Sequence, residues 1–210
     1  TGSDNTAVGK SALEQNTTGG SNTAVGEGAL KANTTASNNT GLGKDALEVN
    51  TTGTNNVSVG DFSMNSNTTG SSNTVVGSGA LDSNTTADHN TAIGRNALGV
   101  NTTGGDNVAV GSGTLDANTT GTYNTGVGKS ALTSLTTGSN NVAIGRVAME
   151  LAQTSYNSVA VGVRSLDANL SGGYNTAVGD GALSAYTGSE NTAVGGNALA
   201  ACTTGHDNTG

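Results

Sequence analysis

The side chains of this sequence that are suited to catalysis are few and scattered. The two histidines, His89 and His206, lie in different halves of the chain, and neither has an acidic or thiol cluster beside it. The single cysteine, Cys202, has no histidine at the spacing of a nucleophile and its base, and alone it cannot form a disulfide within the chain. We therefore expect no enzyme activity, no cofactor and no metal site.

Acidic and glycine-rich turns are also candidates for ligand binding. Calcium-binding β-roll repeats carry an aspartate at the same place in every turn. Here Asp4, Asp45, Asp61 and Asp82 occupy different places, so the sequence does not predict a repeating calcium site. Gly-x-Gly triplets such as residues 26–28 have no helix pattern after them, which a phosphate-binding loop requires.

Asn-Thr-Thr triplets are the most regular motif that could carry chemistry. They match the acceptor pattern of N-glycosylation, so one interpretation is a rod coated with glycans. The other is a ladder of stacked Asn and Thr turns. Apolar residues such as Leu135 later take the place of the asparagine, which favours the ladder and indicates a site facing the interior or a neighbour. The candidate acceptors are Asn16, Asn33, Asn50, Asn67, Asn84, Asn101 and Asn118.

A 17-residue repeat determines where all of these residues stand. Residues 5–9, Asn-Thr-Ala-Val-Gly, are followed by Ala-Leu and by Asn-Thr-Thr-Gly, and the pattern recurs along the whole chain with one final step of 16 residues. Self-similarity at a fixed short period is typical of solenoids and fibres. The sequence therefore predicts an all-β fold, a parallel β-solenoid or β-roll with one coil per repeat. The array covers residues 1–210 as a single domain of about 12 coils.

Composition and charge exclude several classes of partner. The chain has 34 glycines, no proline, no tryptophan and 10% charged residues, but its apolar residues keep a strict register that a disordered chain has no reason to maintain. A net charge of −8 argues against nucleic acid and against an anionic membrane surface. Since no long apolar run is present, we expect no membrane insertion.

Two apolar columns are predicted to form the core of the rod. One is the aliphatic column of Val8, and the other is the Leu13 column, which never admits a polar residue. Thr6 shares the face of Val8 in a strand, so the column of Ala7, which holds only small or slender residues, should point outward against a neighbour. The core ladders begin with Val8, Val25, Leu42 and Val59 in one column and Leu13, Leu30, Leu47 and Met64 in the other.

Polar columns should stack in the same way. The Asn5 column is asparagine in every coil but one and predicts an amide ladder. Lys10 and Glu27 occupy one column in consecutive coils, and Lys31 and Glu48 another, so opposite charges should face each other. The Asn ladder begins with Asn5, Asn22, Asn39 and Asn56.

The small apolar content of each coil predicts self-association. Each coil is expected to bury only one Val, one Leu and a few small residues. The free energy of that burial does not match the conformational-entropy cost of ordering 17 residues. We expect a homotrimer or another bundle of chains, in contact along the small-residue face. Neither end of the sequence carries a polar cap, so we also expect a segment of a longer fibre or a subunit that stacks end to end.

The motif Asn-Thr-Ala-Val-Gly-x-x-Ala-Leu resembles the head repeats of YadA-like trimeric autotransporter adhesins. With its Asn-Thr-Thr-Gly spacer it is also similar to the repeats of phage-type tail-fibre proteins. The resemblance covers essentially all 210 residues. It implies a left-handed parallel β-roll that trimerises, although the adhesin heads use a shorter coil.

Two functions are compatible with these features. The first is an extracellular structural fibre or adhesin segment, a rigid rod for attachment at a cell surface or on a virion appendage, with a cell-surface or polysaccharide receptor. The alternative is a binding module whose repeated ladders recognise polysaccharide or ice. Stacked threonines could order water, and Tyr123, Tyr156 and Tyr174 could stack against sugars.

Overall fold

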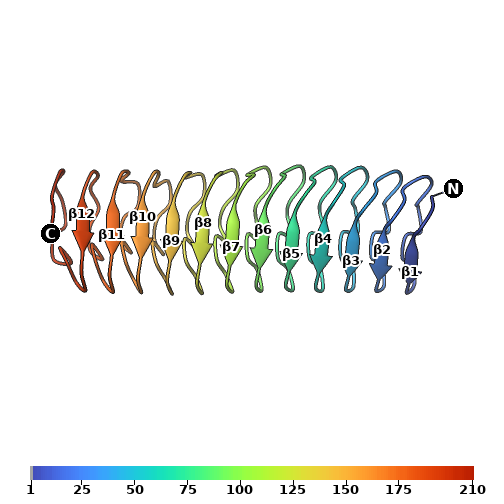
Figure 1. Ribbon diagram of the computed structural model, residues 1–210, viewed down its shortest axis with the longest axis horizontal. Coiled ribbons are helices and arrows are strands. Elements are labelled where there is room, and N and C mark those ends of the chain that lie inside the picture. Colours follow the sequence, from blue (N-terminus) through green and yellow to red (C-terminus); the bar gives the residue numbers. More distant parts are fainter. Residues whose placement is uncertain (1) are drawn as a thin grey trace.

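Within residues 2–210, twelve three-residue strands, one per repeat, lie side by side in a single parallel sheet whose order follows the sequence. This computed structural model describes residues 2–210, and the coils stack into one rod with the chain ends at opposite tips (Figure 1). The strands are β1 Thr6–Val8, β2 Thr23–Val25, β3 Thr40–Leu42, β4 Val57–Val59, β5 Thr74–Val76, β6 Thr91–Ile93, β7 Val108–Val110, β8 Thr125–Val127, β9 Val142–Ile144, β10 Val159–Val161, β11 Thr176–Val178 and β12 Thr192–Val194.

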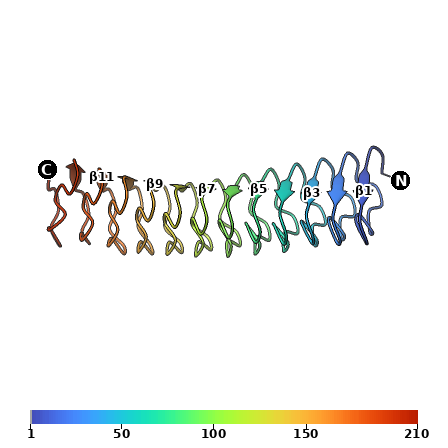
Figure 2. The same cartoon turned by 90° about the horizontal axis from the view of Figure 1, so that it is seen from below.

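Residues 17 positions apart pair directly. Val8 lies opposite Val25 in the β1–β2 ladder, and the same register continues through every neighbouring pair. The 16-residue repeat keeps this register too, because Thr176 pairs with Thr192. The predicted parallel β-solenoid with one coil per repeat is confirmed. Figure 2 shows the strands along one side of the rod and the rest of each coil on the other.

The interior of the rod lies between the middle residue of each strand and the Leu13 column. Ala92, in the middle of β6, is 0% exposed, whereas Ile93 beside it is 39% exposed. Leu30, Leu47 and Met64 are fully buried, and Leu13 in the first coil is partly buried. The prediction is therefore confirmed for the Leu13 column.

The prediction that the Val8 column forms the other half of the core is wrong. A three-residue strand turns either its middle side chain or its two outer ones inward, and the two choices differ by one residue of register. Volume decides between them: a Cβ on Gly41, in the middle of β3, would lie 3.3 Å from Leu30 Cγ, so only a slender side chain fits. The residues that point outward instead include Val8, Val25, Leu42 and Val59.

The glycine after each strand makes the corner of the coil. Gly9 has a φ of +129°, and a Cβ there would lie 2.6 Å from the carbonyl oxygen of Gly26. Both the positive φ and the close approach of the next coil exclude any other residue.

Leucines of the core column occupy the left-handed region, which is rare for a bulky residue. Leu30 has a φ of 51° and its amide donates to the carbonyl of Ala46 at 3.0 Å, in the next coil. The left-handed conformation costs about 1–2 kcal/mol per residue. Full burial of a leucine contributes about 1.5–3 kcal/mol, which offsets that cost.

Candidate interaction surface

Two ladders of asparagine hold the coils in register from inside. In the Asn5 column, the side-chain oxygen of Asn22 accepts from the backbone amide of Asn39 at 2.9 Å. Its side-chain nitrogen donates to the carbonyl of Ala36 at 2.9 Å. Each amide therefore links its own coil to the next while it is fully buried. This satisfies backbone groups that would otherwise be buried without partners.

The Asn-Thr-Thr asparagines form the second ladder. Asn33 donates through Nδ2 to Oδ1 of Asn16 at 2.8 Å and to the carbonyl of Ala36 at 3.0 Å. Both hydrogens of the nitrogen are used, and the side chain is buried. The ladder interpretation is confirmed, and the Asn33 nitrogen has no free hydrogen that a bond to a glycan could replace. The other candidate acceptors are placed alike: Asn50, Asn67, Asn84, Asn101 and Asn118 are buried, and Asn16 is partly buried and bonded to Gly19.

This second ladder ends at Asn118. Leu135 occupies the next place and cannot donate, so Oδ1 of Asn118 is buried without a hydrogen-bond partner in the described part of the chain. Farther along, Tyr186 fills the same column and its hydroxyl donates to the carbonyl of Gly205. The apolar replacements face the interior of the rod, which was one of the two places that the sequence allowed.

The outer face of the sheet, here called the strand face, is a regular surface that runs along the rod. It consists of the first and third residue of every strand, and neither rank contains a charged residue. The third rank is aliphatic in all twelve strands: Val8, Val25, Leu42, Val59, Val76, Ile93, Val110, Val127, Ile144, Val161, Val178 and Val194. The first rank alternates irregularly between threonine and valine. Such a face suits apolar contact or ordered water.

Stacked pairs of opposite charge lie outside the two ranks of the strand face. Lys10 and Glu27 form the predicted ion pair at 3.1 Å, and the Lys10 hydrogen bond lowers the pKa of the Glu27 carboxyl. Lys31 and Glu48 also pair, at 3.7 Å. Lys44 instead lies 3.7 Å from Asp45 and 5.0 Å from the centre of the Phe62 ring.

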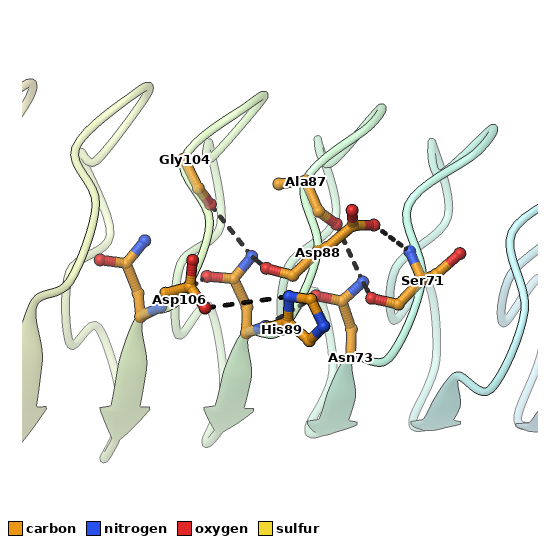
Figure 3. Close-up of polar contacts among 9 residues, drawn as sticks. Ser71, Asn73, Ala87, Asp88, His89, Gly104 and Asp106 are labelled. Carbon is orange, nitrogen blue, oxygen red and sulfur yellow. Dashed lines mark hydrogen bonds and ion pairs between the residues drawn. The ribbon is translucent and has the colours of Figure 1, made fainter.

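The outer turns are tied together by short polar contacts. Asp88 accepts from the backbone amide of Ser71 at 2.6 Å, and His89 lies 3.8 Å from Asp106 (Figure 3). His89 is mostly exposed, as expected of a surface residue. No group of three or more His, Cys, Asp or Glu side chains within residues 2–210 is placed to hold a metal ion.

A polar notch of about 310 Å³ lies on the side of the rod. It opens where Gly99 interrupts a column of larger side chains, between Asp82 and Asp116 in the coils on either side. Burial raises the pKa of both carboxyls. Our sequence analysis did not identify this notch, although Gly99 as the one glycine of its column was the signal for it.

Comparison of the chain with models of protein families, with curated protein sequences and with solved structures gave no match. Within residues 2–210 there is no helix long and apolar enough to cross a membrane.

Proposed function

We propose that this chain is the rigid rod of an extracellular fibre or adhesin, located at a cell surface or on a virion appendage and acting without catalysis. The observation that carries the proposal is the uninterrupted stack of twelve coils in one register. Eleven spacings of about 4.8 Å give a rod of about 50 Å. A solenoid of this kind holds whatever it carries at a fixed distance from its base.

The strand face supports self-association as part of this function. It is uncharged and two-thirds aliphatic, with 16 of its 24 side chains valine, leucine or isoleucine, whereas the chain carries a net charge of −8. Contact between copies would remove the aliphatic rank from water, and every coil would add an equal share. We propose a homotrimer in contact through this face. The earlier expectation placed the contact on the Ala7 column, which the fold turns inward.

Sedimentation of the purified chain tests the association. We expect a mass three times that of the chain at micromolar concentration, and a monomer mass when Val76→Lys and Ile93→Lys place charges on the strand face. Thr69→Lys and Thr86→Lys lie on exposed positions outside that face and should leave the mass unchanged. A monomer mass for the unaltered chain, with its circular dichroism intact, would refute the association while leaving the rod.

Electron microscopy tests the location and the role. An antibody raised against the chain should label filaments or appendages outside the source cell or on the virion. Labelling confined to the cell interior would refute the proposal.

A second function is favoured by the regularity of the strand face. Hydroxyl and methyl groups repeat at the strand spacing, about 4.8 Å, on a rigid support. An array of this kind is able to order water and bind ice. Thermal hysteresis that disappears in Val76→Lys would support ice binding, and its absence in the unaltered protein would exclude it.

A further inference from the structure

Exposed tyrosines gather on one edge of the rod, next to the strand face. The chain has only four tyrosines, and three of them are exposed: Tyr123 (60%), Tyr156 (42%) and Tyr174 (57%). The turn positions that they occupy hold Ser, Asn, Asp, Thr or Gly in most other coils. The fold therefore does not require an aromatic ring there, and a ring left in water calls for another explanation.

These residues form a line along the rod. Tyr123, Asn140, Asn157 and Tyr174 occupy one position in four consecutive coils, so an aromatic ring stands at each end with two amides between them. Three strand spacings give the line a length of about 14 Å. All four side chains are exposed, and no side-chain hydrogen bond of Asn140 or Asn157 to the described residues occupies their amides.

The backbone holds this line rigidly. The Tyr174 amide donates to the carbonyl of Tyr156 at 3.2 Å, and the Asn157 amide donates to that of Ser139 at 3.1 Å. The Tyr123 amide donates to the carbonyl of Gly105 at 3.3 Å. Because the main chain is hydrogen-bonded from coil to coil, the Cα atoms that carry these exposed side chains are held in place, which lowers the entropy cost of binding.

Tyr156 and Tyr174 make a fixed aromatic corner at one end of the line. Their ring centres lie 5.4 Å apart and their planes meet at 87°. The ring of Tyr156 covers Gly173, where a Cβ would lie 2.5 Å from the ring atoms, so this coil has room for the ring only because it carries a glycine there. The corner is therefore built into the fold.

Charge around the line selects the chemistry of a ligand. Asp106 precedes Tyr123 in the same column, Glu190 follows Tyr174, and the two turn columns of the tyrosines contain no lysine or arginine. Phosphates and acidic sugars would be repelled. Neutral sugars suit the site, because their C–H faces stack on tyrosine rings while their hydroxyls bond to amides and phenols.

We propose that Tyr123, Asn140, Asn157, Tyr156 and Tyr174, the tyrosine edge, form a binding subsite for a neutral oligosaccharide lying along the rod axis. This deepens the proposed role in surface attachment and rests on it. A short line of rings and amides on an open edge gives weak binding per rod, which repetition in a multimer would strengthen.

Affinity electrophoresis in gels containing a neutral glucan, a neutral galactomannan or acidic polygalacturonate tests the subsite. We expect at least one neutral polysaccharide to retard the protein and the acidic one to have no effect. The double variant Tyr123→Ser, Tyr174→Asn should weaken retardation about tenfold, since each lost stacking contact contributes about 0.5–1.5 kcal/mol. Both replacements copy residues found in this column in other coils, so folding should be unaffected.

Phe62→Ser is the matched control, because it removes an exposed aromatic ring elsewhere on the rod and copies the residue at Ser11 and Ser130. It should bind like the parent. Equal binding by the double variant, retardation only by polygalacturonate, or no retardation by any of the three would overturn the subsite. Sedimentation of the same variants separates the two proposals, since loss of glycan binding with an unchanged mass contradicts neither the rod nor its association.

Discussion

The two parts of the rod differ in what fills the second asparagine column. In residues 5–121, every coil contributes an asparagine that bonds to its neighbours. In residues 122–210, the same place holds Leu135, Ala152, Asn169, Tyr186 and Cys202. The strands nevertheless pair in one register throughout. The amide ladder is thus not what defines the coil: the leucine column, the strand and the corner glycine do.

The second part replaces the ladder with separate local solutions. Ser155 donates to the carbonyl and to the side-chain oxygen of Asn169, at 3.0 and 2.9 Å. Tyr186 fills its position with a fully buried ring. At the junction Oδ1 of Asn118 is buried without a hydrogen-bond partner among the described residues, and farther along Oδ1 of Asp167 is too. Within a ladder of identical amides, each side-chain oxygen accepts a hydrogen bond from the next asparagine. The last oxygen has no such donor, so the cost of burying an unpaired polar atom falls at the end of the ladder.

The largest expected effect tests the corner glycine, which both parts of the rod share. Gly94→Ala would place a Cβ 2.6 Å from the carbonyl carbon of Gly111, and Gly162→Ala would place one 2.5 Å from that of Gly179, both at a φ of +135°. Each should lower the free energy of unfolding by more than about 3 kcal/mol, because strain and backbone overlap add. Urea titration measures this. Gly196→Ala, which has nothing within 4 Å, should be nearly neutral; a mild effect of Gly162→Ala would show that the second part tolerates a different corner.

How far the sequence predicted the fold can be judged from individual columns. The period predicted the stacking and both amide ladders, because each follows from placing identical residues on top of one another. The direction of the strand side chains was predicted wrongly, since hydrophobicity favours Val8 inside and only volume places Ala7 there. The Ala7 column holds only slender residues, and the Leu13 column always holds leucine or methionine. This difference in size was the signal in the sequence that the Ala7 column faces the leucines inside the rod. The Tyr156 ring over Gly173 required coordinates, because it depends on a side-chain direction.

The next largest effect compares an asparagine in the middle of the second ladder, Asn67, with the last one, Asn118. Asn67→Leu removes the donor to Asn50 Oδ1 and to the Gly70 carbonyl, and it leaves a hydrogen of Asn84 without its acceptor. We expect the free energy of unfolding to fall by about 2–4 kcal/mol. This loss is expected even though the same column accepts a leucine at residue 135.

Asn118→Leu should cost about half as much as Asn67→Leu. It deprives Asn101 Oδ1 and the Gly121 carbonyl of a donor, but it also removes a buried side-chain oxygen, Asn118 Oδ1, that already lacked a partner. Chemical denaturation of both variants measures the difference. Equal costs would mean that the end of the ladder is satisfied by water.

A smaller effect concerns the backbone in the irregular part. Val147 has a φ of 53°, a conformation that disfavours a β-branched residue, and Asn96 has a φ of 55° at the equivalent place. Val147→Asn should raise the free energy of unfolding by about 1 kcal/mol, and Asn96→Val should lower it by a similar amount. Thermal melting of the pair checks both signs. A stabilising Asn96→Val would mean that side-chain packing outweighs backbone strain at this position.

The smallest expected effect is a pH dependence from partly buried carboxyls. Burial raises the pKa of Asp82 above its ordinary value of 3.8, and it raises that of Asp167, where the nearby Glu150 charge adds to the effect. A carboxyl whose pKa is higher in the folded state binds its proton more tightly there. Ionisation of the carboxyl therefore lowers the free energy of unfolding. The stability of the rod is greatest below the ordinary pKa and falls as the pH rises through the raised pKa of the folded state.

Asp82→Asn should accordingly stabilise the rod slightly at pH 7 and flatten the slope of melting temperature against pH just above 3.8. Asp167→Asn should flatten it more, because it also removes the repulsion with Glu150. Asp61→Asn, on an exposed position, is the control. If the slope is unchanged in both variants, water reaches both carboxyls in the folded rod. For Asp82 this would mean that the notch beside Gly99 is open enough to hydrate its carboxyl.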